Sequence, residues 1–357
     1  MIILKQLFHK ATPPDVVQQF WSWFVRHESR YRLKQWSPAD FLEAAIDQLQ
    51  SFDPWLKLLV SGDNGGELEL IVTADGDIAL FTRVHELVRA APQVPGWRFT
   101  PLKQPMGMEQ VRIEMNGEEF SRATLHFYAE ESDRFPDEVA LVLTHKAYRT
   151  ADDELFQSGG MIYLENALGE LNAATRIDRY RVGPEPADKS KMIALGKLPD
   201  YLLWREKEAG TRRGSPALDV QRPADRWRII EAEDRTGRPM LAAFNRAYHD
   251  WPHRPCFPWL VAIHIQYKGR RDGLPDERQW AGLQQMEDEI LALLPQAEVI
   301  LLGHKTYDHL RVIYLYAIDY WNSSVVLNDY RQQSGWPYDL AFYMTLDKYW
   351  QAASGFF

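Results

Sequence analysis

Cysteine is almost absent from this sequence, because Cys256 is the only one in 357 residues. An intrachain disulfide is therefore excluded, and such a composition is typical of proteins from a reducing compartment. Long apolar runs are also absent, since no stretch approaches the roughly 20 residues of a membrane-spanning helix. The apolar run at the start, Met1–Leu4, is too short for a signal peptide. Together these absences predict a cytoplasmic protein without a membrane span.

An excess of positive charge is the next missing feature. Lysine and arginine number 41 against 50 aspartate and glutamate residues, which gives a net charge of -9 and a pI of about 5.6. Surfaces that hold nucleic acid are normally basic, because neutralising phosphates supplies most of their affinity. We therefore expect no nucleic-acid partner and no membrane partner. An acidic surface suits a partner protein that is itself basic, since opposite charges steer the encounter.

Motifs of common catalytic centres are missing as well. The sequence has no Gly-x-Ser-x-Gly nucleophile elbow and no His-Glu-x-x-His zinc motif. The glycine-rich run Gly62–Gly66 lacks the Lys-Ser/Thr ending of a phosphate-binding loop, so it predicts a turn. We expect no cofactor, and a non-enzymatic protein is favoured over an enzyme.

What the chain does contain is typical of a folded protein with substantial cores. Hydrophobic residues make up 45%, and the large rings of 13 Trp, 16 Tyr and 16 Phe residues bury much area each. A chain of this length is expected to form about two domains. The run Gly210–Pro216 is rich in Gly, Pro and charge and has no periodicity. We therefore predict an N-terminal domain at residues 1–208, a linker at 209–224 and a C-terminal domain at 225–357.

Apolar periodicity and turn signals predict a mixture of helices and strands in the first domain. The clearest helix start is at Ser37, which can cap the helix, with Pro38 at the first position and Asp40 where a capping box places its acid. Helices are expected at residues 14–27, 38–49, 78–90 and 191–206. Strands are expected at residues 56–60, 67–73, 97–102, 111–115, 124–129, 139–144, 161–164 and 177–182.

The second domain is predicted to combine strands with two helices. Strands are expected at residues 227–232, 240–248, 258–267, 299–302, 310–318 and 339–345, and helices at 276–294 and 321–333. A hairpin is expected to turn around Lys305–Asp308, which would leave His304 and Thr306 solvated. Several hairpins among helices favour antiparallel sheets. The predicted fold class is α+β, with two domains of mostly antiparallel sheet, helices packed on one face, and a ferredoxin-like C-terminal domain.

Three stretches of the second domain carry a resemblance to a known family. They are Gly273–Pro275 leading into Leu283 and Met286–Asp288, Gly303–Thr306 followed by Arg311 and Tyr314–Tyr316, and the ending Tyr343–Trp350. Over roughly residues 227–350 the chain resembles the bacterial domain of unknown function 695 family. Members of that family are sometimes joined to a domain similar to the ribonuclease E inhibitor of the B type, which has a ferredoxin-like fold and acts by binding. The resemblance implies a binding module, whereas the N-terminal domain is not recognised.

Glu287 is the strongest candidate for chemistry. It lies beside the apolar stripe of the predicted helix 276–294, so burial is expected to raise the pKa of its carboxyl, which is one mark of a general acid or base. His264 and His304 lie at positions on or next to predicted strands and could face the same helix. A hydrolase-type site of these three residues is therefore the alternative to a binding module. The more ordinary expectation is that Glu287 flanks the core and pairs with an arginine such as Arg311.

His249, His253 and Cys256 form the densest cluster of metal-ligand residue types. Prolines at 252, 255 and 258 exclude a regular helix here, and no second cysteine can complete a structural zinc site. A proline-rich loop packed by its aromatic residues is expected in place of a metal site.

Aromatic clusters such as Trp21–Phe24 fill ordinary cores, but aromatic side chains also anchor interfaces. Trp23 and Tyr31 are the candidates for exposure and therefore for binding a partner. Taken together, these patterns favour a non-enzymatic protein-binding module of the inhibitor or immunity type, whose partner is a basic protein.

Overall fold

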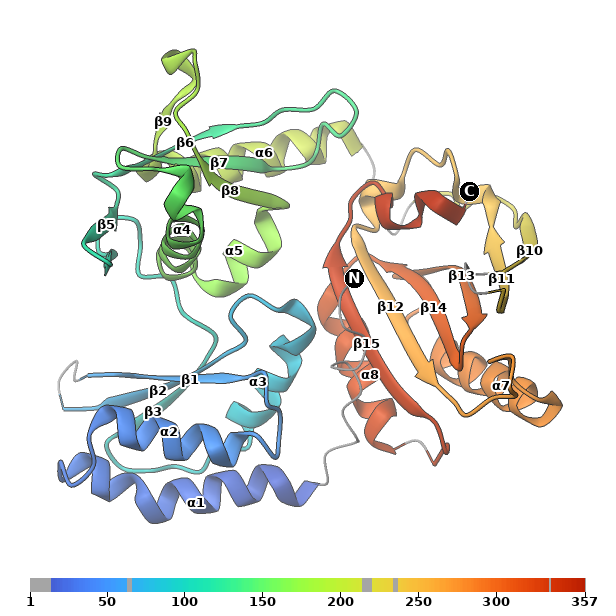
Figure 1. Ribbon diagram of the computed structural model, residues 1–357, viewed down its shortest axis with the longest axis horizontal. Helices are drawn as coiled ribbons and strands as arrows, with labels where there is room; N and C mark the ends of the chain where they lie inside the picture. Colours follow the sequence, from blue (N-terminus) through green and yellow to red (C-terminus); the bar gives the residue numbers. More distant parts are fainter. Residues whose placement is uncertain (1–13, 63–65, 214–219, 234–236, 334, 357) are drawn as a thin grey trace. The chain divides into compact units, whose positions relative to one another are not determined.

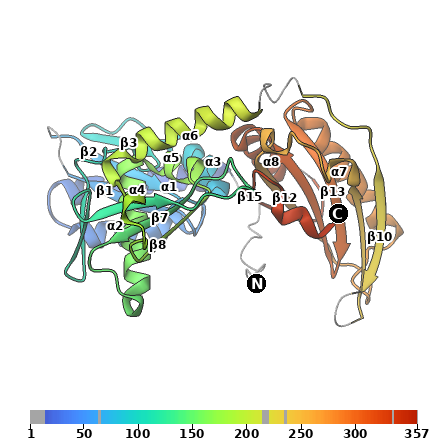
Figure 2. The ribbon, with the colours of Figure 1, turned by 90° about the horizontal axis from the view of Figure 1, so that it is seen from above.

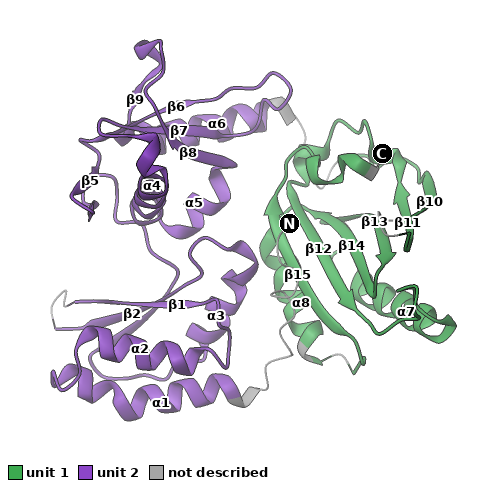
Figure 3. Cartoon of the chain, in the orientation of Figure 1, with its two compact units in different colours: residues 1–13, 213–357 green, residues 14–212 purple. Residues whose placement is uncertain are grey.

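The computed structural model describes residues 14–62, 66–213, 220–233, 237–333 and 335–356. The chain divides into two compact units, which Figure 3 shows in different colours. The N-terminal unit comprises Pro14–Arg212, and the C-terminal unit includes Arg213–Phe357. Both combine helices with mostly antiparallel sheets, which confirms the predicted α+β class. Within the described ranges, no helix combines the length and the apolar character needed to cross a membrane.

The first half of the N-terminal unit is a three-stranded sheet with helices packed against it (Figure 1). Its strands are β1 (Lys57–Ser61), β2 (Leu68–Thr73) and β3 (Trp97–Pro101), and its helices are α1 (Pro14–Arg32), α2 (Pro38–Leu49) and α3 (Phe81–Arg89). In the order β1-β2-β3, β1 and β2 are antiparallel, and β3 runs parallel to β2. A parallel pair needs a crossover connection, which α3 supplies here.

Helix α2 begins where its sequence signal predicts. Ser37 Oγ accepts a hydrogen bond from the N–H of Asp40 at 3.1 Å, and the Asp40 carboxylate accepts one from the N–H of Ser37 at 3.3 Å. This capping box satisfies backbone donors that the first turn leaves unpaired. The helix then buries Phe41, Ala45 and Leu49, which fixes its apolar face.

The second half of the N-terminal unit contains a hairpin, a four-stranded sheet and three helices. The strands are β4 (Arg112–Met115), β5 (Glu118–Ser121), β6 (Leu125–Ala129), β7 (Ala140–His145), β8 (Arg179–Gly183) and β9 (Ile193–Ala194), and the helices are α4 (Asp153–Leu168), α5 (Glu170–Arg176) and α6 (Leu198–Arg213). β4 pairs with β5, and the other strands form a sheet in the order β8-β7-β6-β9. β7 is buried along its whole length, and its Leu141 and Leu143 belong to one core with Phe127, Phe156 and Leu164.

The C-terminal unit is built on one six-stranded sheet in which all neighbouring strands are antiparallel. Its strands are β10 (Trp227–Glu233), β11 (Pro239–Asn245), β12 (Trp259–Gln266), β13 (Val299–Tyr307), β14 (Leu310–Ala317) and β15 (Asp339–Leu346). The order is β10-β11-β13-β14-β12-β15, which places β10 at one edge (Figure 2). α7 (Glu277–Leu293) connects β12 to β13, and α8 (Tyr320–Gln333) connects β14 to β15. The last elements therefore follow one another as β-α-β-β-α-β.

The two faces of this sheet are covered differently. The helix face, which includes Trp259 and Arg311, carries both helices: Arg311 bonds to α7, and the Trp259 ring contacts Tyr320 of α8. The opposite face, here called the turn face, includes Leu260 and Tyr316. On the turn face, the Trp350 ring stacks on Tyr316 with centroids 4.1 Å apart. Both faces therefore have a core, although the α-helices lie on only one of them.

An irregularity in β13 changes which of its residues face the helices. The register of β13 against β14 shifts between Leu301 and Gly303, as in a β-bulge. Leu302 belongs to the core of the turn face, whereas His304 pairs with Ile313 and lies on the helix face. A Cβ on Gly303 would lie 2.2 Å from the Ala243 carbonyl oxygen, so only glycine fits at this point.

Two predicted elements of the first domain differ from the structure. The strand expected at residues 161–164 is wrong, because this segment belongs to α4. A short apolar run fits a strand or a buried helix equally well, and here Phe156, Tyr163 and Leu164 are buried together at helical spacing. α6 begins at Leu198 and continues to Arg213, so residues 209–213 of the predicted linker are helical. Residues 214–219 of that linker, and 63–65 of the predicted glycine-rich turn, lie outside the described residues.

The hairpin of the second domain turns later than predicted. β13 extends to Tyr307, and the turn is made by Asp308 and His309, whose left-handed φ values are 39° and 64°. His304 and Thr306 therefore lie within the strand, and Thr306 is fully buried. The expectation that these two residues are solvated in a turn is wrong, because the ladder between β13 and β14 continues past them.

Candidate functional site

Glu287 is buried on α7 and is held by side chains from the helix face of the sheet. The Arg311 guanidinium donates two hydrogen bonds to Glu287 Oε2, one of them from Nε at 2.9 Å, and His304 Nδ1 lies 3.1 Å from Oε1. Burial alone would raise the pKa of Glu287, but the hydrogen bond with His304 and the charge of Arg311 outweigh it and lower that pKa. The predicted raised pKa is wrong, whereas the expected pairing with Arg311 is found.

The two histidines of the predicted set lie on opposite faces of the sheet. His304 pairs with Ile313 on the helix face, whereas His264 pairs with Val312 on the turn face. Successive side chains of a strand alternate between faces, so His264 lies on the side away from Glu287. The expected convergence of Glu287, His264 and His304 is therefore wrong, and only Glu287 and His304 meet.

His264 is buried, and one of its ring nitrogens makes no hydrogen bond within the described residues. The residue is 6% exposed, its Nδ1 has no hydrogen-bond partner among the described residues, and its ring packs edge-on against Tyr343. Burial, together with the charge of Lys305, lowers the pKa of His264 from the usual 6.5 to about 4. The imidazole is therefore neutral near pH 7.

The three metal-ligand candidates lie in the loop between β11 and β12. His249 Nδ1 is 2.9 Å from Asp250 Oδ2, the His253 ring packs edge-on against Trp251, and Cys256 is buried in the core of the turn face. In the part of the chain that the structure describes, no three His, Cys, Asp or Glu side chains are grouped so as to hold a metal ion. The loop is packed through aromatic residues, since Trp251 is itself buried.

Trp23 and Tyr31, the predicted binding residues, both pack against other rings. Trp23 is 9% exposed and stacks on His27 with ring centroids 4.9 Å apart. The expected exposure of Trp23 is wrong, because this side of α1 faces α2, where the ring meets Phe41. Tyr31 is half-buried beside Phe41 and Trp97. Partner binding by these residues stays a prediction, and their packing gives it no support.

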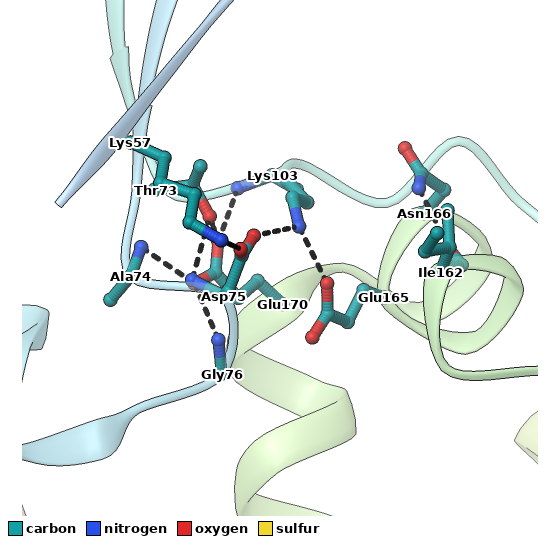
Figure 4. A network of polar contacts seen from close by, with 10 residues as sticks. All are labelled: Lys57, Thr73, Ala74, Asp75, Gly76, Lys103, Ile162, Glu165, Asn166 and Glu170. Carbon is teal, nitrogen blue, oxygen red and sulfur yellow. Dashed lines mark hydrogen bonds and ion pairs between the residues drawn. The ribbon is translucent and has the colours of Figure 1, made fainter. Parts of the chain in front are cut away.

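A cluster of charged side chains that was absent from the sequence predictions lies in the N-terminal unit (Figure 4). Lys57 begins β1, Asp75 follows β2, Lys103 follows β3, and Glu165 lies on α4. Lys57 Nζ is 2.6 Å from Asp75 Oδ2, and Lys103 Nζ is 2.7 Å from Asp75 Oδ1. The same Lys103 Nζ is 2.6 Å from Glu165 Oε2. Cations and anions therefore alternate along an ion-pair series of these four side chains.

Glu170, at the start of α5, fastens the loops that follow β2 and β3. Its fully buried carboxylate accepts hydrogen bonds from Thr73 Oγ1 at 2.6 Å and from the N–H groups of Ala74, Gly76 and Lys103 at 3.0, 3.0 and 3.1 Å. Several donors on one carboxylate offset the unfavourable burial of its charge. Both loops, and with them Asp75 and Lys103 of the ion-pair series, are thereby fixed against α5 (Figure 4).

The groups of the ion-pair series respond differently to burial. Burial raises the pKa of Glu165, because its effect exceeds that of the Lys103 ammonium. Burial opposes the charge on Asp75 too, but hydrogen bonds from Lys103 and Lys57 outweigh it and lower the pKa of Asp75. Burial alone would lower the pKa of Lys103, but its hydrogen bonds to Asp75 and Glu165 outweigh this effect and raise that pKa. Glu165 is 2% exposed, and its Oε1 has no hydrogen-bond partner among the described residues.

The ion-pair series lines a cleft of about 710 Å³ within the N-terminal unit. Polar side chains continue the lining at Gln157, Ser158, Asn166 and Tyr180, and apolar ones at Ile46, Leu58, Leu59, Met161 and Ile162. Small-molecule sites typically measure roughly 300–1,000 Å³ and combine apolar walls with a few converging polar groups. The cleft has both properties.

A second hollow, of about 700 Å³, lies where α7 and α8 run beside each other in the C-terminal unit. We call it the acidic groove, and it is lined by Glu289 and Leu293 of α7, by Val326, Asp329, Tyr330 and Gln333 of α8, and by Gly335 and Trp336. Glu289 Oε2 accepts hydrogen bonds from Trp336 Nε1 at 2.9 Å and from Tyr330 Oη at 2.7 Å. These bonds lower the pKa of Glu289, so its carboxylate is ionised at neutral pH.

Comparison with known proteins is informative only for the C-terminal unit. No curated protein and no solved structure matches the chain. A family model confirms the resemblance seen in the second domain: the C-terminal region, residues 226–356, matches the model described as Family of unknown function (DUF695).

Proposed function

We propose that the protein is a non-enzymatic protein-binding module that takes a basic partner, in the manner of an inhibitor or immunity protein. The observation that carries this proposal is the acidic groove between α7 and α8. The resemblance to a bacterial family and the single cysteine support a bacterial cytoplasmic location as part of the same proposal.

The charge of the acidic groove favours a cationic occupant. Glu289 and Asp329 both line it, and Asp329 is exposed. The bonds from Trp336 and Tyr330 already hold the Glu289 carboxylate in place, so little ordering is needed when a cation approaches. The net charge of -9 adds a long-range attraction for a basic protein.

The same groove also offers apolar contact. Leu293 is 57% exposed, and Val326 is half-buried next to the carboxylates. Exposed apolar side chains beside charged ones are typical of an interaction surface. Trp336 and Tyr330 are rings whose polar atoms are bonded, and such rigid aromatics dominate the binding energy of many interfaces. A partner segment that combines lysine or arginine with aliphatic side chains satisfies both parts of the groove.

The architecture of the C-terminal unit is compatible with this use. The succession β12-α7-β13-β14-α8-β15, with the strand order β13-β14-β12-β15, supports a ferredoxin-like arrangement. α7 and α8 lie on the same face of that sheet, so a partner can occupy the groove between them without disturbing the strand ladders.

Fluorescence anisotropy with labelled peptides tests the proposal. A soluble peptide of lysine and leucine, with leucine at helical spacing, is expected to bind the full-length protein saturably. Its counterpart with glutamate in place of lysine is expected not to bind. The affinity for the basic peptide is expected to fall as salt rises, because exposed charges are screened beyond roughly 10 Å at 0.1 M ionic strength.

A pair of double variants separates the acidic groove from the net charge. Glu289→Gln/Asp329→Asn removes the two carboxylates of the groove and is expected to weaken peptide binding about tenfold. Glu43→Gln/Asp47→Asn removes the same charge from exposed positions of α2 and is expected to have little effect. Equal weakening by both double variants would show that net charge alone attracts the peptide. Absence of binding by the basic peptide would contradict the proposed function.

A further inference from the structure

The cleft of the N-terminal unit brings two cations and two anions into one small volume, and the proposed protein-binding function uses none of them. Lys57, Asp75, Lys103 and Glu165 line it as the alternating series shown in Figure 4. A ligand of single charge would meet a like charge beside every opposite one. We propose that this cleft binds a small zwitterion with an aliphatic side chain, such as an apolar α-amino acid.

Two groups of the series keep hydrogen-bonding capacity for such a ligand. The Lys103 ammonium has three N–H donors, and Asp75 and Glu165 use only two of them. Glu165 Oε1 has no partner among the described residues, although the residue is 2% exposed. Buried polar atoms are nearly always paired, and a donor group of a ligand accounts for this exception. The carboxylate of the zwitterion is therefore placed at Lys57 and Lys103, and its ammonium at Asp75 and Glu165.

The apolar wall of the cleft explains why the ligand carries an aliphatic chain. Leu59 and Ile162 are 40% and 36% exposed, and both line the cleft with Ile46 and Met161. Large aliphatic side chains are stabilised when they are removed from water, and an aliphatic group in the cleft would cover these. The lining therefore combines charged groups with aliphatic ones, and an apolar amino acid has both a charged and an aliphatic part.

The loops that carry the charged groups are held in unfavourable backbone conformations. Asp75 and Leu102 have φ values of 48° and 60°, in the left-handed region that non-glycine residues rarely adopt. The hydrogen bonds of Glu170 to both loops keep them there. Strain that the surrounding structure maintains is typical of positions where side chains are fixed for binding. Asp75 and Lys103 are therefore placed before any ligand arrives.

Isothermal titration calorimetry of the full-length protein, with L-leucine and three analogues, tests the proposal. 4-Methylpentanoate lacks the ammonium group, 3-methylbutylamine lacks the carboxylate, and glycine lacks the aliphatic chain. L-Leucine is expected to bind at least about tenfold more tightly than each analogue, because only it meets both charges and the apolar wall. An analogue that binds as tightly as leucine would overturn the proposal, and so would the absence of binding by all four compounds.

Matched variants locate the ligand in the cleft. Ile162→Gln is expected to weaken leucine binding about tenfold, whereas Leu203→Gln, on α6 and outside the lining, is expected to leave it unchanged. Lys57→Gln is expected to weaken it about fivefold, and Lys207→Gln, also exposed, is expected to have no effect. A cleft variant that behaves like its control would overturn the assignment.

These experiments distinguish a failure of the proposed leucine site from a failure of the proposed acidic groove. Glu289→Gln/Asp329→Asn is expected to retain leucine binding, because its two positions lie in the C-terminal unit and outside the cleft lining. Ile162→Gln is expected to retain binding of the basic peptide for the same reason. Loss of leucine binding in the groove variant would show that the cleft is not an independent site.

Discussion

Glu165 of the N-terminal unit and Glu287 of the C-terminal unit are both buried on helices beside a cation, yet their pKa values shift in opposite directions. The pKa of Glu165 is raised, mainly by burial, and that of Glu287 is lowered although burial opposes this. Similar burial therefore gives one acid that resists ionisation and one that remains charged.

The difference between the two carboxylates lies in their partners. Arg311 donates two hydrogen bonds to one oxygen of Glu287, and His304 contacts the other oxygen. Lys103 reaches only one oxygen of Glu165, and the charges of nearby acids oppose ionisation further. The comparison teaches that the number of donors around a buried carboxylate decides its charge state more than the depth of burial does.

Removal of Arg311 is expected to have the largest effect on stability. Arg311→Met leaves the Glu287 carboxylate buried without its cation, and it is expected to lower the free energy of unfolding by about 3–5 kcal/mol. Urea unfolding at pH 7 measures the effect. The double variant Arg311→Met/Glu287→Met, which removes both charges, is expected to recover a large part of the loss. A single variant that unfolds like the unmodified protein would mean that the pair does not hold the two groups as the geometry indicates.

His264 tests the same effect of partners on a basic group, because it is buried and its Nδ1 has no hydrogen-bond partner among the described residues. The pKa of the His264 imidazole is about 6.5 in the unfolded chain, and it is lowered to about 4 in the folded protein. The stability that depends on the neutral imidazole is therefore complete above pH 6.5 and is lost as the pH falls toward 4. The loss is expected to reach about 3 kcal/mol. In His264→Phe, the free energy of unfolding measured between pH 7 and pH 4 is expected to depend less on pH; an unchanged pH profile would contradict this account.

Lys103→Met is expected to have the smallest effect of the three, about 2 kcal/mol at pH 7. Glu165 already has a raised pKa, so it can take up a proton when its cation is lost, which Glu287 does less readily. A raised folded pKa means that stability falls as the pH rises above the usual 4.5 of an unfolded glutamate. The destabilisation by Lys103→Met should therefore be larger at pH 8 than at pH 5 in thermal unfolding. A loss as large as that of Arg311→Met would show that the two carboxylates are equivalent after all.

Local signals in the sequence predicted much of the fold. The capping box of Ser37 and Asp40 marks the start of α2, and the stripe of Leu283, Met286 and Ile290 identifies the buried side of α7. Both signals depend on residues a few positions apart, which a helix brings together by itself. The strand wrongly predicted at 161–164 shows the limit, because a short apolar run does not distinguish a strand from a buried helix.

Of the two candidate sites, the sequence indicates the one around Glu287 but not the one around Lys103. Glu287 is recognisable in the sequence because it lies next to an apolar stripe, and its pairing with Arg311 follows from the need of a buried acid for a cation. Lys103 gave no such signal, because its partners Asp75 and Glu165 lie 28 and 62 positions away and meet it only in the folded protein. Long-range pairs of charges carry no local pattern, so the cleft could not be predicted from the sequence.

The bulge at Gly303 shows that the chain length of a strand, and not only its residue types, decides the chemistry of a sheet. One additional residue between Leu301 and Gly303 reverses the alternation that follows, and so assigns His304 and Thr306 to the side of Glu287 and Arg311. If the same residues formed a regular strand without the bulge, both side chains would lie on the side of His264. The polar cluster on α7 would then lose two of its members without a single substitution. Deleting the additional residue would instead leave both side chains in place, because the pairs from Gly303 onward would continue the regular alternation. The bulge therefore exchanges the two faces for every later residue of the strand.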